Sequence, residues 1–156
     1  TNWCTSEVTD MSFLFCFETE HADRTADALC KLPEDSRELF NEDIGKWNTA
    51  AVTDMTNMFY RACAFNQDIG DWDVGAVTDM MRMFFVAGDF NQDISEWDVA
   101  AVTDMNFMFK YATDFKQDLA GWCENDEVKD YGMFYLSGCV DPCGMDGDNE
   151  PACTSD

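Results

Sequence analysis

Hydrophobic side chains recur along this chain with a period of 25 residues. Phenylalanine and tryptophan each appear four times at that interval: Phe40, Phe65, Phe90 and Phe115, and Trp47, Trp72, Trp97 and Trp122. Between them the phrase Ala-Val-Thr-Asp-Met occurs three times, at 51–55, 76–80 and 101–105. Self-similarity with a period of about 20–50 residues is typical of stacked repeats, because one such unit cannot bury its apolar side chains alone.

Each repeat contains two apolar segments with different spacing. In the middle repeat a short extended segment is indicated by three residues: Ile69, Trp72 and Val74. An amphipathic helix is predicted by apolar residues at intervals of three, four and seven: Met80, Met83, Phe84 and Ala87. Thr78 is expected to cap this helix, and Asp79 suits the positive end of its dipole. The fold class that follows is α/β, a right-handed β/α solenoid of about five rungs with a parallel sheet.

The repeats at the two ends are degenerate. Trp3 and residues 8–15 match the frame of the regular repeats, but Asp10 and Asp54 are 44 residues apart, so 19 extra residues form an insertion between Cys16 and Leu39. After Trp122, residues 128–131 and 134–135 continue the pattern one residue late. Atypical end units are expected in a stacked array, because they shield its core from water. We therefore expect one domain, 1–156, divided into an N-terminal repeat with a capping insertion (1–39), three regular repeats (40–122) and a degenerate repeat with a Cys-rich C-terminal cap (123–156).

Eight cysteines lie in two groups near the ends of the chain. The first group is Cys4, Cys16, Cys30 and Cys63, and the second is Cys123, Cys139, Cys143 and Cys153. Zinc is an alternative, since Cys139 and Cys143 are four residues apart, but the sequence has no Cys-x-x-Cys pair and its one histidine is distant. We expect disulfides within each group and never between them, which staple the ends of the solenoid and indicate an oxidising compartment.

The chain carries 32 acidic against 9 basic residues, a formal net charge of −23. A field of this sign repels nucleic acid and anionic membranes and attracts cations and basic proteins. The sequence also has no run of 18 apolar residues that would span a membrane. We therefore expect protein partners with a basic surface, and neither nucleic-acid binding nor membrane insertion.

Aspartates also recur in register. The columns are Asp43, Asp68, Asp93 and Asp118, then Asp10, Asp54, Asp79 and Asp104, then Asp73 and Asp98. Such carboxylates could hold Ca²⁺, which prefers six to eight oxygen ligands. We favour the interpretation that each aspartate accepts hydrogen bonds from amides of its own rung, and we expect no cofactor. A looser Ca²⁺ candidate is the acidic tail: Asp141, Asp146, Asp148 and Glu150.

Other notable residues have structural interpretations. A column of threonines could order ice or water, but helix capping explains one threonine per rung more simply: Thr9, Thr53, Thr78 and Thr103. The methionines stand beside phenylalanines and are expected to fill the core. His21 lies in the insertion without a nearby nucleophile, and no Ser-His-Asp, P-loop or dinucleotide motif is present. We therefore expect no enzymatic activity.

The repeat phrase W-D-V-x-x-V-T-D-M-x-x-M-F-x-x-A-x-x-F-N-Q-D-I, from Trp72 to Ile94, resembles the BspA-like leucine-rich repeat. The variant it resembles is abundant in mycoplasma lipoproteins and in marine protists, and the likeness extends from Trp3 to Cys139. It implies a leucine-rich-repeat-like solenoid of secreted or cell-surface proteins, often adhesive, and brings no catalytic residues.

The leading hypothesis is a non-catalytic protein-interaction or scaffolding module, secreted or exposed on a cell surface. One alternative is a structural subunit of a larger assembly, such as a filament or the lumenal side of a membrane complex, in an oxidising organelle lumen. Another is a solenoid that binds Ca²⁺, ice or a small ligand. The insertion either caps the repeats or contacts the partner, and its acidic residues would attract a basic surface: Glu18, Glu20, Asp23, Glu34, Asp35 and Glu38.

Overall fold

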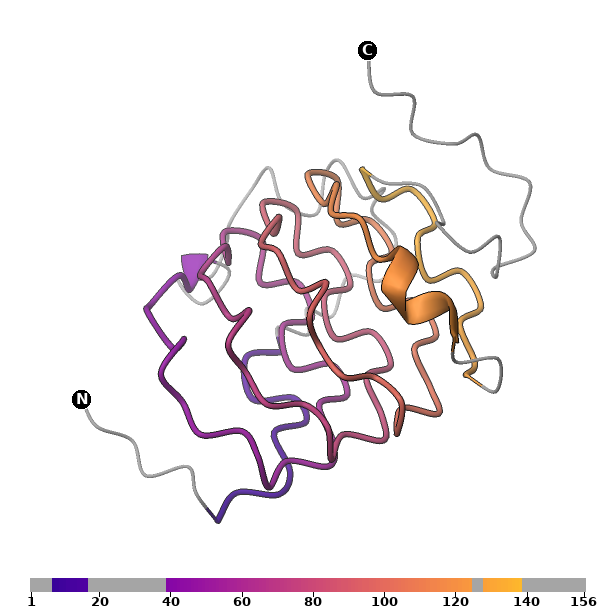
Figure 1. Ribbon diagram of the computed structural model, residues 1–156. Helices are drawn as coiled ribbons and strands as arrows, with labels where there is room; N and C mark the ends of the chain where they lie inside the picture. The colour runs from indigo at the N-terminus through magenta and orange to yellow at the C-terminus, as the bar shows by residue number, and fades with distance from the viewer. Residues whose placement is uncertain (1–6, 17–38, 125–127, 139–156) are drawn as a thin grey trace.

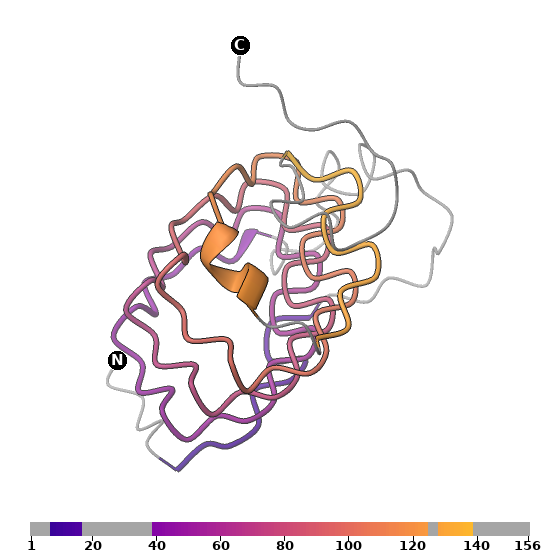
Figure 2. The same cartoon turned by 45° about the vertical axis from the view of Figure 1, so that its right-hand side comes forward.

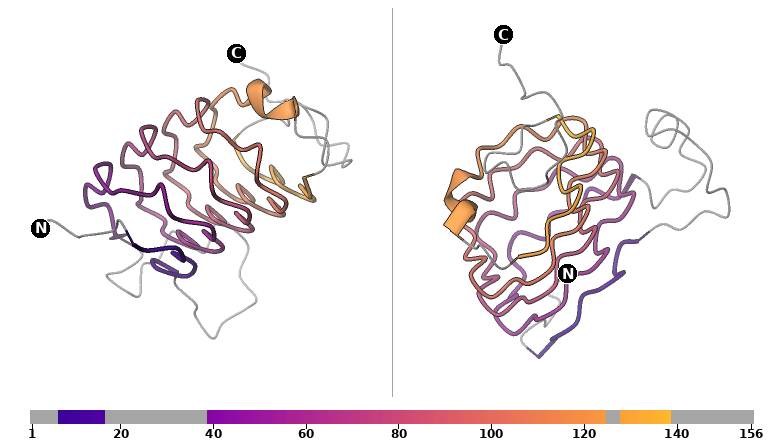
Figure 3. Two further views of the ribbon diagram at one scale, coloured as in Figure 1. Left: turned by 60° about the horizontal axis from the view of Figure 1, so that its bottom comes forward. Right: turned by 90° about the vertical axis from the view of Figure 1, so that its right-hand side faces the viewer.

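A computed structural model describes residues 7–16, 39–124 and 128–138 of the chain (Figure 1). Residues 40–64, 65–89 and 90–114 form three successive coils, residues 115–124 and 128–138 belong to a further coil that follows, and 7–16 belongs to a coil that precedes them. The colours run in order from indigo to yellow along the stack, so the order of coils in space follows their order in sequence (Figures 1 and 3). The 25-residue period of the sequence is therefore the length of one coil.

Equivalent residues of neighbouring coils lie side by side. Parallel β-bridges join one position through the whole stack: Asp10, Asp54, Asp79, Asp104 and Lys129. One residue earlier, the amides of Thr53, Thr78 and Thr103 each donate to the carbonyl of the threonine in the preceding coil, at 2.8–2.9 Å. The register between regular coils is thus 25 residues. Asp10 pairs with Asp54, so the register between the first and second coils is 44 residues, which confirms the predicted position of the insertion.

The predicted helix from Thr78 to Ala87 is wrong. The amides of Met83, Phe85 and Ala87 donate to the carbonyls three residues back, which closes three overlapping β-turns. The amides between them donate to the next coil, as Phe84 does to the carbonyl of Met108 at 2.9 Å. Half of the backbone bonds therefore hold the turn segment together and half hold the coils to one another, whereas a helix would keep all of them internal.

Left-handed residues allow this turn segment to zigzag. In the third coil Arg82 and Val86 have φ values of 55° and 58°, each at the third position of a turn, as a type II turn requires. The same two positions are left-handed in the other described coils: Asn57 and Arg61, Phe107 and Tyr111, Gly132 and Leu136. The zigzag segments of successive coils stack on one side of the molecule (Figure 2).

Regular secondary structure is sparse in the described residues. The one element is η2, a 3-10 helix at Ala120–Glu124, and pairing between coils takes the form of isolated bridges. The extended segment predicted from Ile69 to Val74 is instead bent by a turn, since the amide of Trp72 donates to the carbonyl of Ile69 at 3.1 Å. The expected strand and helix of each repeat are therefore replaced by turns, while the right-handed winding and the leucine-rich-repeat class stay predictions.

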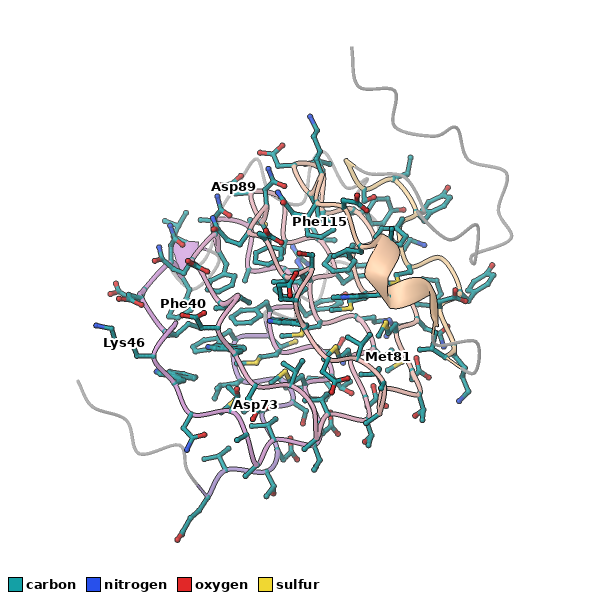
Figure 4. The ribbon with its side chains drawn as sticks, in the orientation of Figure 1. Phe40, Lys46, Asp73, Met81, Asp89 and Phe115 are labelled. Carbon is teal, nitrogen blue, oxygen red and sulfur yellow. The ribbon has the colours of Figure 1, made fainter. Side chains whose placement is uncertain are left out.

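Three columns of stacked aromatic rings fill the interior. The centroids of successive rings are 5.4–5.6 Å apart in one column, 5.8–5.9 Å in the second and 6.4–6.5 Å in the third. These columns are Phe15, Phe59, Phe84, Phe109 and Phe134, then Phe40, Phe65, Phe90 and Phe115, then Trp47, Trp72, Trp97 and Trp122 (Phe40 and Phe115 are labelled in Figure 4). Six methionines of the regular coils are buried beside them, which confirms the predicted core: Met55, Met58, Met80, Met83, Met105 and Met108.

Polar side chains form a second ladder that fixes the register. Asn66 Oδ1 accepts the amide of Asn91 at 3.0 Å and Nε2 of Gln92 at 2.8 Å. The same pair of bonds joins Asn41 to the third coil and Asn91 to the fifth. A slip of one residue would break these bonds in every coil, so the asparagines specify alignment as well as contributing stability.

The last coil keeps the frame of the others. Lys129 forms the bridge to Asp104, and Phe134 stacks on Phe109 at 5.6 Å. The expectation that this coil runs one residue late is therefore wrong. It arose because Val128 and Asp130 resemble the Val and Asp of the repeat, whereas lysine occupies the aspartate position and forms a 3.7 Å ion pair with Asp104.

Candidate interaction face

The zigzag segment presents side chains alternately inward and outward in pairs. Met58 and Phe59 are fully buried in the core. The pairs before and after them are 56–57 and 60–61, and in the third to fifth coils the equivalents of these two pairs are mostly half-buried or exposed. We call the outward positions of all described coils the turn face. Its residues are Ser12, Phe13, Cys16, Thr56, Asn57, Tyr60, Arg61, Met81, Arg82, Phe85, Val86, Asn106, Phe107, Lys110, Tyr111, Tyr131, Gly132, Tyr135 and Leu136.

The composition of the turn face differs from that of the chain as a whole. Seven of its residues are aromatic and three are basic, and it contains no aspartate or glutamate, although the chain carries 32 acidic residues. Tyrosine, phenylalanine, methionine and arginine are enriched at protein–protein interfaces, where charged residues of other kinds are depleted. The turn face therefore has the composition of a recognition surface on an otherwise acidic molecule.

The turn face is also where the repeats differ most in chemical character. The buried positions of the second, third and fourth coils are nearly invariant. Their threonine column and two of their aspartate columns are identical, and the third aspartate column changes only to Asn48 in the second coil. In contrast, one outward position changes from Tyr60 to Phe85 to Lys110, and its neighbour changes from arginine to valine to tyrosine. The stack thus presents a non-repeating surface on a repeating scaffold.

From the second coil to the fifth, exposure of the turn face increases toward the C-terminus. Asn57, Arg61 and Val86 are buried in the second and third coils. The turn-face residues of the fourth coil are half-buried. In the fifth coil, Tyr131 and Leu136 are 61% and 50% exposed. The accessible part of the face is therefore an aromatic patch that extends from Arg82 to Leu136.

Lys110 lies at the centre of this patch. Its Nζ is 4.9 Å from the ring centroid of Phe107, 5.3 Å from that of Tyr111 and 4.5 Å from that of Tyr135. A cation this close to aromatic faces is attracted by the ring quadrupoles, by about 0.5–1 kcal/mol at an exposed site. The three rings therefore hold the ammonium group in place without a carboxylate.

Arg82 contacts the same phenylalanine ring, with its Cζ 5.5 Å from the Phe107 centroid. Within the described part of the chain, neither Arg82 nor Lys110 has a carboxylate within 4.0 Å. Lys129, on a different column, pairs with Asp104 although its side chain is 71% exposed. Absence of an ion pair is thus a local property of Arg82 and Lys110 and is not shared by every cation of the described structure.

The aspartate columns are separate from the turn face, although the column of Asp54, Asp79 and Asp104 borders it, since Thr56 Oγ1 donates to Asp79 Oδ1 at 2.8 Å (Asp73, of another column, is labelled in Figure 4). In each column Oδ1 accepts the amide two residues further on: Asp68 from Gly70, Asp73 from Gly75 and Asp79 from Met81, at 2.9–3.2 Å. These bonds form Asx turns that shape the corners of the coil, as the interpretation we favoured predicted. The described residues contain no group of three or more His, Cys, Asp or Glu side chains placed to hold a metal ion.

The threonine column has a different role from the one predicted. The hydroxyls of Thr53, Thr78 and Thr103 donate to the threonine carbonyl of the preceding coil, at 3.0–3.1 Å. N-capping was wrong because no helix follows. Because these hydroxyl protons are used between coils, the column offers less than the ladder of free hydroxyls that ice ordering requires.

Asp89 and Asp114 stand at equivalent positions of adjacent coils. Partial burial and the negative charge of Asp114 raise the pKa of Asp89. The pKa of Asp93 is lowered instead, because the amide and the hydroxyl of Ser95 both donate to its carboxylate. The surroundings of Asp89 therefore disfavour its ionised carboxylate, whereas those of Asp93 favour it.

Several predicted site residues lie outside the described residues. These are the acidic residues of the insertion (Glu18, Glu20, Asp23, Glu34, Asp35, Glu38), the tail carboxylates (Asp141, Asp146, Asp148, Glu150), His21 and five cysteines (Cys4, Cys30, Cys139, Cys143, Cys153). Cys63 is disulfide-bonded, to a cysteine whose side chain is not among those described, and Cys16 carries a thiol. Pairing within each cysteine group stays a prediction.

The turn face was not predicted from the sequence. We expected a partner contact in the non-repeating insertion, whereas the signal for the turn face is a change of residue type at four positions of otherwise similar repeats. None of the helices described here is long and apolar enough to cross a membrane.

Comparison with known proteins places the chain in a family. The model of the family described as "Mycoplasma protein of unknown function, DUF285" matches residues 30–140. Neither the curated proteins nor the solved structures contain a match. The matched range includes all the regular coils and most of the chain. The chain therefore belongs to the DUF285 family.

Proposed function

We propose that this protein is a non-catalytic interaction module that binds a partner protein through the exposed part of the turn face. The observation that carries the proposal is the combination of five aromatic and two basic residues, without one acidic residue, on the part of the turn face from Arg82 to Leu136, where the repeats diverge. Buried aromatic and arginine anchors contribute most of the binding energy in protein interfaces. The rigid aromatic columns beneath would hold these anchors in position before the partner arrives, which lowers the entropic cost of binding.

The relation of DUF285 to BspA-like repeat proteins supports the same proposal. We propose that the stack of coils is a leucine-rich-repeat-like solenoid of the BspA-like type, and that the protein is secreted or exposed on a cell surface. The disulfide at Cys63 is in keeping with an oxidising location, which an organelle lumen also provides. The structural-subunit alternative uses the same face, and a fixed one-to-one ratio with a neighbour in native complexes would favour it.

A pair of double variants tests the proposal. Tyr131→Ser with Leu136→Ser removes two exposed side chains of the turn face, and Asp71→Ser with Glu96→Ser changes two exposed residues elsewhere. Each protein is used as bait in extracts of its native source, and retained proteins are quantified against wild type. We expect at least one protein to be retained near stoichiometrically by wild type and by the control variant and lost from the turn-face variant. Equal retention by both variants would rule out the turn face as the binding surface.

A further inference from the structure

We propose that Arg82 and Lys110 are the carboxylate-binding pair of the turn face, and that the segment bound there is an acidic amphipathic helix lying along the stack. This inference rests on the proposed function and adds the chemistry of the partner. It also reverses the expectation of a basic partner, because the local charge of the turn face is positive although the net charge of the chain is −23.

Arg82 and Lys110 form no ion pair with a described residue, which leaves them able to bind an external carboxylate. With 32 acidic and 9 basic residues, a cation on this chain has an excess of carboxylates to meet, as Lys129 meets Asp104. Arg82 and Lys110 lie over the Phe107 ring instead, 5.5 and 4.9 Å from its centroid. The hydrogen-bonding capacity of both cationic groups is thus available to an external acceptor, and an arginine fork matches a carboxylate with two parallel bonds.

Screening makes the local charge decisive. At physiological ionic strength the Debye length is about 8 Å, so an acidic segment on the turn face responds to the charges beneath it more than to distant columns. Of the aspartates that precede the turn face in these two coils, Asp79 accepts a hydrogen bond from Thr56 and Asp104 pairs with Lys129. Within the described residues, a carboxylate that approaches Arg82 and Lys110 therefore meets two cations that have no carboxylate within 4.0 Å.

The spacing of the coils indicates a helix. Arg82 and Lys110 belong to adjacent coils, at different positions within them, and both lie over the Phe107 ring. Rings at equivalent positions of adjacent coils are 5.4–5.6 Å apart in the column under this face, which gives the spacing from coil to coil. One turn of an α-helix rises about 5.4 Å, and side chains at i and i+4 are about 5–6 Å apart. A helix parallel to the stack would thus place one turn over each coil and present successive glutamates to successive cations.

Apolar residues beside the two cations complete the match. Phe85 packs edge-on against Tyr111 at 5.7 Å, and Phe107 packs edge-on against Tyr131 at 5.4 Å. The exposed edges of these rings flank the cations over three coils. They suit leucine or similar side chains that neighbour the glutamates on one face of an amphipathic helix.

The test uses the full chain and a designed probe, a side-chain-stapled helical peptide of about four turns with glutamates one turn apart and leucines beside them. Two matched peptides carry glutamine or lysine in place of glutamate. Affinities are measured by fluorescence anisotropy for wild type, R82Q, K110Q and the control K129Q, whose lysine is on another column. Folding of every variant is checked by near-ultraviolet circular dichroism.

We expect the glutamate peptide to bind wild type and K129Q equally, and R82Q and K110Q about tenfold more weakly, as for a lost charge-assisted hydrogen bond. Equal binding of the glutamate and glutamine peptides, no binding of the glutamate peptide, or preference for the lysine peptide would overturn the inference. Full competition by free glutarate at the concentration of the peptide would also overturn it, since it would indicate a simple anion site.

If R82Q and K110Q retain the native partner while Tyr131→Ser with Leu136→Ser loses it, the proposed function stands and this inference fails. If neither set of changes matters, both fail.

Discussion

The indole Nε1–H of Trp97 donates a 3.2 Å hydrogen bond to the carbonyl oxygen of Ile69 in the preceding coil. Trp72 makes the same bond to Ile44, also at 3.2 Å. Trp122 continues the column, stacked 6.4 Å from Trp97, but its buried Nε1 has no hydrogen-bond partner in the described structure. The backbone turns into η2 at this point, and the tryptophan column therefore ends on an unsatisfied donor.

This difference predicts unequal costs for the same substitution. Trp97→Phe removes ring volume and also leaves the buried Ile69 carbonyl without its indole donor, whereas Trp122→Phe removes ring volume and an unsatisfied N–H. We expect Trp97→Phe to lower the free energy of unfolding by about 1 kcal/mol more than Trp122→Phe, the scale of one buried hydrogen bond. Urea denaturation followed by circular dichroism measures both. Equal losses would mean that the indole bond makes no net contribution.

Much of the fold could be predicted from the sequence. The 25-residue interval set the coil length, and the recurring phenylalanines, tryptophans and methionines identified the core, because a repeat places equivalent residues in one column. The path within a coil could not be predicted. Two inward and two outward residues alternate with a period of four, so Met80, Met83, Phe84 and Ala87 reproduce the 3, 4, 7 spacing of a helix although the chain forms turns.

The candidate site could not be predicted for the same reason. On a helix, positions such as Arg82 and Phe85 would belong to an ordinary solvated face. Only the turn geometry places them on the same surface as Phe107 and Lys110, the turn face. The left-handed φ values that create this surface occur at arginine, valine, phenylalanine and tyrosine, residues that seldom adopt them, so no glycine pattern revealed the turns.

Gly132 is the one glycine among these left-handed positions, with a φ of 61°. Gly132→Ala introduces a Cβ that strains the backbone and would lie 2.9 Å from a ring carbon of Phe107. We expect a loss of about 1–2 kcal/mol in the free energy of unfolding. Gly121→Ala is the control, because a Cβ there has no heavy atom within 4 Å. Differential scanning calorimetry of both variants should show a lower Tm for Gly132→Ala alone, and an equal Tm would contradict the strain argument.

Disulfide connectivity gives a third prediction. Cys63 is disulfide-bonded and lies in the second coil, beside the coil that contains residues 7–16. A disulfide needs Cα atoms within about 7 Å, and each coil adds about 4.8 Å along the stack. We therefore expect non-reducing peptide mapping to join Cys63 to Cys4 or Cys30. A bond from Cys63 to Cys123, Cys139, Cys143 or Cys153 would contradict the two-cap organisation, and the Cys63→Ser variant tells which thiol is released.

Asp89 and Asp93 are expected to change the free energy of unfolding in opposite directions as the pH rises, because their pKa values are shifted in opposite directions. The pKa of Asp89 is raised in the folded state, by burial first and by the charge of Asp114 second. Between its unfolded and folded pKa values the native protein binds more protons than the unfolded chain, so the free energy of unfolding falls as pH rises through that window. The ionised carboxylate is therefore unfavourable near neutral pH, and Asp89→Asn should raise the Tm there.

Asp93 is the control with the reverse sign. Its folded pKa is lowered by the amide and hydroxyl of Ser95, so its contribution is favourable above the unfolded pKa and is lost as pH falls through the folded one. Asp93→Asn should thus lower the Tm near neutral pH, and Ser95→Ala should move the Asp93 pKa back toward its ordinary value in a carbon-13 carboxyl titration. Thermal melts of both aspartate variants against wild type, from about pH 2 to pH 7, follow the two effects. The two differences in Tm should have opposite signs at neutral pH and both vanish in acid, where each carboxyl is protonated in both states. A shift of the same sign in both variants would show that general charge reduction, rather than these local contacts, governs the pH dependence.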